Sequence, residues 1–524
     1  MASIAERPDA LAVVEPDRRV TYAELGELVL ASTRAVMGAG VGPGDRVAIW
    51  APNALDWIVA ALGAHGAGAA LVPINTRFKG EEAAWLLSAS KAPLLLTTVG
   101  FLDTDTVGML ASAETPLPDL RRVVLLPGSR PAKDAPVAVA LETWSDFLAA
   151  GVEVAPAAAV ARREAVRPTD PSDVLFTSGT TGRPKGVVVS HGQTVRLFRD
   201  WSDFAGLEPG DRYAIVNPFF HMFGYKAGWV ASLMRGATIF PVPVFDVPAV
   251  LSLVERERIT FLPGPPTLYR SILDHPERGS FDLGSLRVAV TGAADIPVTL
   301  IEEMRAELPF RSILVGYGLT EAGTVTGSHP DDDAETIATT VGRVMPGFEI
   351  RVADADGREL PRGEPGELLV RGHGVMQGYL DDASATAAAI DERGFLHTGD
   401  LATVDERGVV RIVGRLKDMI LVGGFNVYPA EVENALLAHE AIGQVAVVGL
   451  PDKRMGEVPV AYVVAAPGRA IDPIAIVAWS RERLANYKAP RHVVALDALP
   501  INATGKVVKT ELRERAAAEL GAAS

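Results

Sequence analysis

The sequence predicts an α/β protein that is built from more than one domain. Residues 1 to about 170 alternate helical patterns with short apolar runs, such as Thr21–Met37 and Arg46–Trp50, and this alternation is typical of layered α/β sheets with mostly parallel strands. From Val341 onward, short alternating runs between turn residues predict a β-rich region, and a small α+β region follows it. A chain of 524 residues is longer than one hydrophobic core supports, so two or more domains are expected.

The composition excludes several classes of function. A formal charge of −15 argues against a nucleic-acid partner or an anionic membrane surface. The chain has no cysteine, which excludes disulfides and thiolate metal sites and fits a reducing cytoplasm. The N-terminus has no apolar signal sequence, and the apolar stretch Ile58–Pro73 is shorter than the roughly 20 residues of a spanning helix. We therefore expect a soluble, cytoplasmic protein without membrane insertion.

The elements before residue 205 follow from local signals. Pro156 stands at the first position of a helix, where its missing N–H costs nothing. Ser190 and Gln193 form a capping box that begins the next helix. The expected elements are strand Ala69–Pro73, helix Pro156–Val166, strands Val174–Phe176 and Val187–Val189, and a helix from Ser190 to about Trp201.

A polar loop lies between those last two strands, with the sequence Thr177-Ser178-Gly179-Thr180-Thr181-Gly182-Arg183-Pro184-Lys185-Gly186. Its glycines let the backbone approach a ligand, and its amides, hydroxyls and lysine suit a polyanion, so the stretch predicts a phosphate-binding loop. It is not the P-loop of kinases and ATPases, because Lys185 is followed by glycine and a strand. The alternative is a hairpin loop without a ligand.

Two further strands end in glycine-rich stretches. Strand Arg287–Val290 leads to Thr291-Gly292-Ala293-Ala294, before a helix from Pro297 to about Leu308. Strand Ile313–Val315 leads to a second stretch, Gly316-Tyr317-Gly318-Leu319-Thr320-Glu321. Loops that follow consecutive strands should lie side by side at the carboxyl edge of a sheet, where α/β proteins bind ligands.

A lone histidine lies among aromatic residues after strand Ala214–Val216. Such a residue, here His221, is usually part of the core. In a helix after Gly224, Tyr225, Lys226, Trp229 and Val230 would share one face, since positions three and four apart do so. Lys226 could also simply reach solvent.

The C-terminal third contains three more stretches of interest. The first is Thr398-Gly399-Asp400, which alone would be a turn. The second is Gly414-Arg415-Leu416-Lys417-Asp418, which alone would be a charged hairpin. The third is Pro500-Ile501-Asn502-Ala503-Thr504-Gly505-Lys506, which alone would be a solvated loop. The elements expected around them are strands Glu349–Ala353, Gly366–Arg371 and Val409–Val413, helix Ala430–Ala438, strands Val445–Gly449 and Val460–Val464, and helix Pro473–Leu484.

Together these motifs resemble, in order and over essentially the whole chain, those of the AMP-forming adenylating enzymes, which include acyl-CoA synthetases, luciferases and peptide-synthetase adenylation domains. The resemblance implies an N-terminal adenylate-forming domain at 1–414 and a mobile C-terminal domain at 415–524, with the hinge at Lys417.

The same resemblance implies the site residues. The catalytic residues would be Lys506, Thr320, Glu321 and Lys185. ATP would contact Thr177, Ser178, Gly179, Thr180, Thr181, Gly182, Lys185, Gly292, Ala293, Ala294, Gly316, Tyr317, Gly318, Thr320, Asp400, Arg415 and Lys506. Mg²⁺ would be held by Glu321 and Thr180, CoA by Gly423 and Gly424, and the acid by His221, Tyr225, Lys226, Trp229 and Gly292.

The implied reaction consumes a carboxylic acid, ATP and CoA. The acid forms an acyl-adenylate with loss of pyrophosphate, and the CoA thiol then displaces AMP. Lys506 would bridge the carboxylate and the α-phosphate, and positioning and charge neutralisation would supply most of the catalysis. An adenylase that loads a carrier protein and a non-catalytic binding protein are the alternatives. The sequence leaves open whether the chain forms a homodimer.

Three segments bear on the acid: Asn217–Gly228, Leu262–Thr267 and Gly423–Glu433. They resemble actinobacterial acyl-CoA synthetases of steroid catabolism, in particular those that activate the propanoate side chain left on the C and D rings. Bulky Tyr225 and Trp229 would narrow the pocket, and Lys226 or Tyr225 could donate a hydrogen bond to a ring ketone. A medium- or long-chain fatty acid is the alternative substrate.

Overall fold

The computed structural model describes residues 5–130, 139–177, 184–292, 296–423, 425–501 and 507–520. The chain forms two compact units. Unit 1 comprises residues 1–349 and 371–396, and unit 2 comprises residues 350–370 and 397–524. The two units are defined by which residues pack together, and they do not show where the chain bends. The hinge at Lys417 and the domain boundary at 414/415 therefore stay predictions.

The largest sheet of unit 1 has eight strands in the order β18-β9-β8-β4-β3-β5-β6-β7. Its strands from β8 to β7 pair in parallel, as predicted, while β8, β9 and β18 pair antiparallel. The strands are β3 (Arg46–Trp50), β4 (Ala70–Pro73), β5 (Leu94–Thr97), β6 (Arg122–Leu125), β7 (Ala140–Thr143), β8 (Pro171–Thr177), β9 (Lys185–Ser190) and β18 (Gly378–Tyr379).

Two four-stranded sheets complete unit 1, in the orders β10-β11-β1-β2 and β12-β13-β14-β15. Their strands are β1 (Leu11–Val14), β2 (Arg19–Thr21), β10 (Arg212–Ile215), β11 (Thr238–Pro241), β12 (Val288–Thr291), β13 (Ser312–Leu319), β14 (Gly323–Gly327) and β15 (Arg343–Val344).

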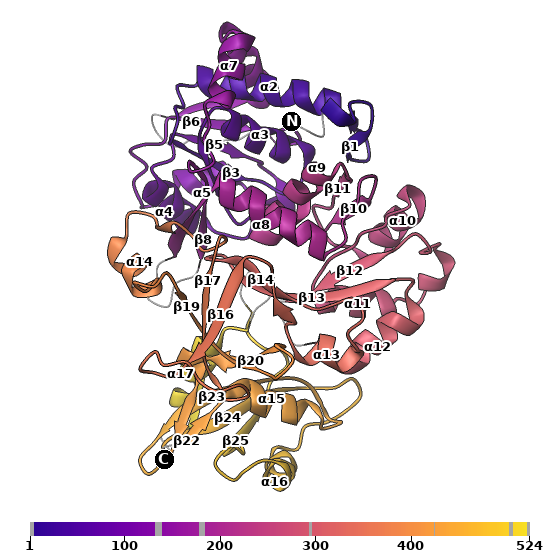
Figure 1. Cartoon of the computed structure of the whole chain (residues 1–524), viewed down its shortest axis with the longest axis vertical. Helices are drawn as coiled ribbons and strands as arrows, with labels where there is room; N and C mark the ends of the chain where they lie inside the picture. The colour runs from indigo at the N-terminus through magenta and orange to yellow at the C-terminus, as the bar shows by residue number, and fades with distance from the viewer. Residues whose placement is uncertain are drawn as a thin grey trace. The chain divides into compact units, whose positions relative to one another are not determined.

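The helices of unit 1 cover these sheets. Helix α3 packs against β3 and β4, and α2 lies beside α3 (Figure 1). The helices are α2 (Tyr22–Gly38), α3 (Leu55–Gly66), α4 (Gly80–Ser90), α5 (Thr106–Ala111), α6 (Trp144–Ala150), α7 (Pro156–Glu164), α8 (His191–Phe204), η3 (Phe223–Val230), α9 (Ala231–Arg235), α10 (Val247–Glu257), α11 (Pro266–Leu273), α12 (Val298–Glu307), α13 (Ala334–Thr339) and α14 (Ala383–Ala389), with short 3₁₀ turns η1 (Phe101–Asp103), η2 (Gly151–Glu153) and η4 (Arg278–Ser280).

Unit 2 contains a four-stranded sheet, β16-β17-β19-β20, and a sheet β22-β21-β24-β23 with β25 paired to β24. The β-rich region and the α+β region predicted from the sequence are therefore both present. The elements are β16 (Phe348–Ala353), β17 (Gly366–Gly372), β19 (Leu396–Val404), β20 (Val410–Arg415), η5 (Leu416–Asp418), β21 (Ile420–Val422), β22 (Phe425–Val427), α15 (Pro429–Leu437), β23 (Ile442–Asp452), β24 (Gly456–Ala465), α16 (Pro473–Arg483), β25 (His492–Ala495) and α17 (Lys509–Leu520).

Capping determines where two of the predicted helices begin. Helix α2 starts after Thr21, whose side chain forms a capping box with Glu24. Helix α8 starts after Ser190 with the predicted capping box to Gln193. In the part of the chain that the structure describes, none of these helices is both long and apolar enough to cross a bilayer.

Two local predictions were wrong. Gly316–Leu319 was expected to be a loop, but β13 continues through it because it pairs antiparallel with β14. The segment after Gly224 was expected to be a helix with the spacing of an α-helix, but Phe223–Val230 forms a π-helix. A π-helix bonds residue i to residue i+5 and is rare, and it is found frequently at functional sites.

Candidate functional site

The two ends of the predicted phosphate loop lie opposite each other. Strands β8 and β9 form an antiparallel pair in which Thr177 is the partner of Lys185 and Phe176 the partner of Gly186. The loop residues between them, Ser178, Gly179, Thr180, Thr181 and Gly182, lie outside the described residues. Thr177 and Lys185, the two ends of the loop, are half-buried, and the pairing of β8 with β9 holds them opposite each other.

Lys185 lies close to a tyrosine that the sequence analysis did not single out. Its ammonium is 5.0 Å from the ring centroid of Tyr379. The Tyr379 hydroxyl donates a hydrogen bond to Glu321 Oε1 over 3.1 Å. Burial, followed by the neighbouring Glu321 carboxylate, raises the pKa of Tyr379, so its phenol is protonated at neutral pH. Tyr379 thus contacts two of the predicted catalytic residues at once.

Thr320 and Glu321 lie in the turn between β13 and β14, which the Ala322 amide closes by donating to the Leu319 carbonyl. Tyr317, predicted to stack on adenine, is half-buried on β13 with Thr326 as its partner on β14. Gly316 and Gly318 flank it on the same strand.

Gly292 follows β12, which pairs in parallel with β13. A Cβ at Gly292 would lie 3.2 Å from the Gly316 carbonyl, so the ends of the two strands are in close contact, as predicted. Ala293 and Ala294 lie outside the described residues.

Asp400 and Arg415 form the second part of the predicted nucleotide site, within unit 2. They are cross-strand partners on β19 and β20, and Arg415 Nε is 2.9 Å from Asp400 Oδ1. The Asp400 side chain is 6% exposed and that of Arg415 is 51% exposed. Both were expected at the ribose, and the structure brings the pair together.

The remaining residues predicted in unit 2 are only partly described. Lys417 is exposed in the turn η5, and Gly423 is exposed after β21 with a positive φ of 58°. Lys506 and Gly424 lie outside the described residues. Their roles stay predictions.

The predicted acyl pocket centres on the π-helix. His221 is exposed just before it, and Tyr225 and Trp229 are buried and stacked, with ring centroids 5.0 Å apart. Trp57 of α3 packs 5.9 Å from each of the two rings. These side chains form an aromatic wall, which we define as Trp57, Tyr225 and Trp229.

Lys226 is also buried, so it does not reach solvent. Its side chain is 2% exposed, and its ammonium lies 2.9 Å from Oδ1 of Asp173, whose side chain is fully buried. Asp173 Oδ2 accepts a hydrogen bond of 2.5 Å from Ser172. Burial lowers the pKa of Lys226, and Asp173 opposes that effect.

Two histidines adjoin this ion pair. His65 Nε2 lies 3.0 Å from the Ser172 carbonyl and 3.3 Å from the Tyr225 hydroxyl, and its ring packs 5.0 Å from that of His191. Burial, with smaller contributions from His191 and Lys226, lowers the pKa of His65 to about 3. Burial also lowers the pKa of His191. At neutral pH both rings are therefore uncharged.

Asn53 is a second residue that the sequence analysis missed. Its side-chain amide donates to the carbonyls of Ile215, Asn217 and Val242 over 3.0 to 3.1 Å, and its oxygen accepts from the Phe219 amide over 2.7 Å. It thereby holds the segment that leads to His221. The only local signal is a polar amide shortly after a buried strand, β3.

A metal site made only of protein side chains is not found among the described residues, which contain no group of three suitable ligands. Mg²⁺ commonly needs only one or two carboxylates when substrate phosphates and water supply the other ligands. Glu321, which Tyr379 links to Lys185, supplies one such carboxylate.

Known proteins and family models resemble this chain over most of its length. Residues 2–380 match the family model "AMP-binding enzyme", and residues 431–506 match "AMP-binding enzyme C-terminal domain". Proteins of Rhodococcus jostii (strain RHA1) and Mycobacterium tuberculosis (strain ATCC 25618 / H37Rv) are each 50% identical to this chain, over 96% and 98% of it and 95% and 97% of their own lengths. Both are named 3-[(3aS,4S,7aS)-7a-methyl-1,5-dioxo-octahydro-1H-inden-4-yl]propanoyl:CoA ligase.

A solved structure, ATP-bound MatB from Rhodopseudomonas palustris, has a TM-score of 0.83 with this chain. It is 30% identical, and the likeness covers 97% of this chain and 96% of that chain.

Proposed function

The chain belongs to the AMP-binding enzyme family as an AMP-forming acid–CoA ligase, and we propose that its acid is a propanoate attached to a compact, oxygenated bicyclic ring system. The observation that carries the proposal is the 50% identity, over nearly the whole chain, to two ligases named for such an acid.

The aromatic wall supports a compact substrate. A tunnel for a long alkyl chain requires small side chains along its length, whereas Trp57, Tyr225 and Trp229 pack against one another with little or no exposed surface. Rings packed in this way leave little space for a chain to pass, and a compact, rigid ring system also loses less rotamer freedom on binding than an alkyl chain does.

The ring ketones of the acid need hydrogen-bond donors. Tyr225 and Lys226 stay the predicted donors, but each already has a buried partner: Tyr225 with His65, and Lys226 with Asp173. An ammonium has three N–H groups, so Lys226 can pair with Asp173 and still donate elsewhere. A hydrogen bond from Tyr225 or Lys226 to the substrate would therefore come from a side chain that its buried partner already holds in place.

In the proposed reaction, the acid carboxylate attacks the α-phosphorus of ATP and pyrophosphate leaves. Lys185 binds the phosphates, Thr320 contacts the α-phosphate, and Lys506 bridges carboxylate and phosphate. Tyr317 stacks on adenine, and Asp400 with Arg415 holds the ribose. Glu321, with Thr180, would hold Mg²⁺, which neutralises charge on the leaving pyrophosphate.

In the second step, the CoA thiolate attacks the acyl carbon and the bond to AMP breaks. This gives the thioester and free AMP, and the thiol proton is lost to solvent. We propose that the C-terminal domain turns about Lys417 between the two steps, withdrawing Lys506 and presenting Gly423 and Gly424 to CoA.

The test is CoA-dependent AMP formation with the bicyclic dione propanoate, octanoate and palmitate. We expect the bicyclic acid to give the highest kcat/KM. A higher value for either fatty acid would overturn the proposed substrate while leaving the ligase activity intact. Pyrophosphate exchange without AMP release on addition of CoA would instead indicate an adenylase that loads a carrier protein.

A further inference from the structure

Tyr379 connects two charged side chains that the proposed reaction requires. Its hydroxyl donates to the Glu321 carboxylate over 3.1 Å, and its ring lies 5.0 Å from the Lys185 ammonium. One side chain therefore contacts both the lysine of the predicted phosphate loop and the glutamate expected to hold Mg²⁺. All three side chains are half-buried, and all three residues belong to unit 1.

The backbone around Tyr379 is fastened to the strand that carries Lys185. Tyr379 and Gly378 of β18 are the antiparallel partners of Val187 and Val188 on β9. The Leu380 amide donates to the Gly186 carbonyl over 2.7 Å. Gly186 directly follows Lys185, so the ring and the ammonium are held by adjoining backbone segments.

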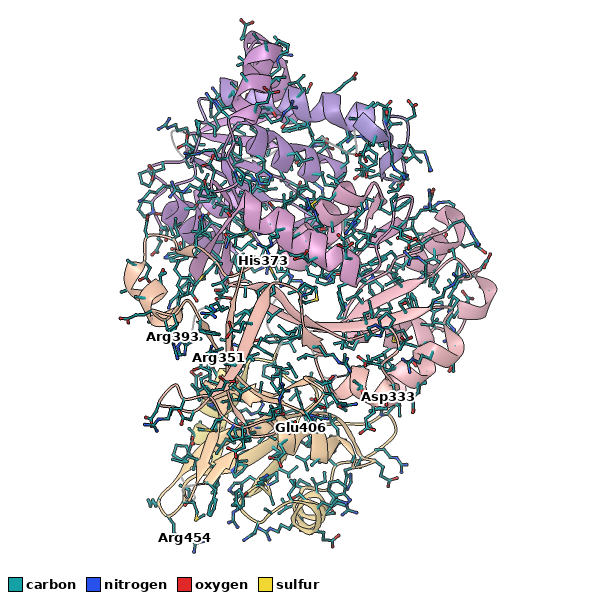
Figure 2. The ribbon with its side chains drawn as sticks, viewed as in Figure 1. Asp333, Arg351, His373, Arg393, Glu406 and Arg454 are labelled. Atoms are coloured by element: carbon teal, nitrogen blue, oxygen red, sulfur yellow. The ribbon has the colours of Figure 1, made fainter. Side chains whose placement is uncertain are left out.

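The same segment is also fastened to the turn that carries Glu321. The Met376 amide donates to the Glu321 carbonyl over 2.7 Å, and the Tyr379 amide donates to Thr386 Oγ1 over 2.9 Å. Upstream, His373 pairs with Asp200 of α8 over 3.2 Å (His373 is labelled in Figure 2). Tyr379 itself is held by pairing with β9 and by the bond to Thr386, and its segment is bonded to the turn that carries Glu321.

Both charged partners need such support. A lysine side chain has four rotatable bonds, and a glutamate carboxylate on a turn can adopt several rotamers, so each loses freedom when it binds a phosphate or a metal. A phenol that donates to the carboxylate fixes one oxygen, and an aromatic face attracts the ammonium without neutralising its charge. Preorganised charges stabilise a transition state better than charges that must be reoriented.

We propose that Tyr379 is a positioning residue that holds Lys185 and Glu321 ready for the triphosphate and its Mg²⁺. The role rests on the proposed function, because it presumes that the two residues bind MgATP.

The substitutions Tyr379→Phe and Tyr379→Leu separate the two contacts. Phenylalanine keeps the ring beside Lys185 and loses only the bond to Glu321, whereas leucine loses both. Tyr462→Phe is the matched control, because Tyr462 is a buried tyrosine of unit 2 whose hydroxyl has no hydrogen-bond partner in the described part of the chain.

Binding is measured by calorimetry on the full chain without any acid, over a series of Mg²⁺ concentrations. We expect Tyr379→Phe to raise the Mg²⁺ concentration needed for half-maximal ATP binding by about tenfold, the value of one hydrogen bond to a charged group. Tyr379→Leu should also weaken ATP binding at saturating Mg²⁺. Tyr462→Phe should change neither quantity, and melting temperatures report whether each variant is folded.

A second measurement tests whether Tyr379 acts through Glu321. In a Glu321→Gln background, Tyr379→Phe should have little further effect on the Mg²⁺ requirement, because the carboxylate that it positions is gone. An undiminished effect in that background, or equal effects of Phe and Leu on Mg²⁺ and ATP, would overturn the proposal. Since no acid is present, a wrong substrate assignment cannot produce either result.

Discussion

Lys226 and Asp173 form an ion pair of 2.9 Å in which both side chains are almost completely removed from solvent. Lys226 lies on the π-helix, and Asp173 lies on β8, the strand that leads into the predicted phosphate loop. The pair therefore links the wall of the predicted acyl pocket to the strand before the nucleotide site.

The first prediction concerns the stability of this pair. Replacing one partner leaves a buried, unpaired charge, so Asp173→Asn or Lys226→Met should lower the free energy of unfolding by about 3 to 5 kcal/mol. The double variant should be less destabilised than the sum of the two single variants, because it leaves no such charge. Urea unfolding of the four proteins measures the coupling.

Lys91→Met with Asp381→Asn is the matched control, because that ion pair also spans 2.9 Å but both side chains are more than half exposed. Its coupling energy should be about 1 kcal/mol or less. Equal coupling energies for the two pairs would show that burial does not govern the Lys226–Asp173 interaction.

The second prediction concerns pH. Burial lowers the pKa of His65 from 6.5 to about 3, so the unfolded chain binds a proton that the folded chain does not. The contribution of His65 is fully present above pH 6.5 and decreases as the pH falls toward 3. Between pH 6.5 and about 3, proton uptake by His65 in the unfolded chain lowers the free energy of unfolding by about 1.4 kcal/mol for each unit that the pH falls.

The substitution His65→Gln keeps a side-chain amide that can donate to the Ser172 carbonyl but does not titrate. Between pH 7.5 and 5, the stability of this variant should fall less steeply than that of the unsubstituted protein. His329→Gln is the control, because His329 is exposed. If the three proteins show the same slope, the proton uptake on unfolding belongs to other groups.

Sequence signals of short range predicted many elements of the fold, although others, such as β5, α10 and α17, were not predicted. Thr21 with Glu24 and Ser190 with Gln193 cap their helices within one turn, so neighbouring residues alone determine where α2 and α8 begin. The predicted parallel strands β3 and β4 likewise follow from continuous apolar runs, whereas the parallel strand β7 is mostly exposed and was not predicted.

The two wrong predictions depend on partners that lie outside the segment itself, whether nearby in the sequence or far away. Gly316-Tyr317-Gly318 has the composition of a turn, and only pairing with β14 makes it a strand. The residues of the π-helix carry no local signal for its geometry, and its lysine is paired with a residue on β8. Composition cannot show either contact.

The candidate site shows the same division. Motif residues such as Lys185, Glu321 and Asp400 could be named in advance from the family resemblance, and their roles stay predictions. Tyr379 and Asn53 could not, because each acts by bonding to segments far along the chain. Supporting residues of this kind are visible only after the chain has folded.

The third prediction concerns Lys506. If Lys506 serves adenylation alone, Lys506→Ala should reduce acyl-adenylate formation by several orders of magnitude and leave thioester formation from supplied acyl-adenylate and CoA nearly intact. The two half-reactions are assayed separately, and a melting curve checks the fold. Lys509→Ala is a nearby control, because Lys509 pairs with Glu433 within unit 2. Equal losses in both half-reactions for Lys506→Ala would contradict the two-step domain rotation.

The last prediction concerns the aromatic wall. Trp229 is 1% exposed and stacks on Tyr225, so Trp229→Leu leaves space inside the aromatic wall and loosens the packing behind the predicted acyl pocket. The looser packing should lower kcat/KM for the bicyclic dione propanoate by about tenfold or more, because a buried aromatic contributes both area and specific ring geometry to the wall that shapes the pocket.

The same substitution should affect flexible acids in the opposite direction. Octanoate can bend into the space that leucine leaves, so its kcat/KM should stay constant or rise. Trp479→Leu, on α16 of unit 2, is the matched control and should leave the ranking of the acids unchanged. If Trp229→Leu lowers kcat/KM for octanoate and the bicyclic acid by the same factor, the tryptophan supports the fold without selecting the substrate. A changed ranking, in contrast, assigns the selection to the wall, since stability alone affects both acids equally.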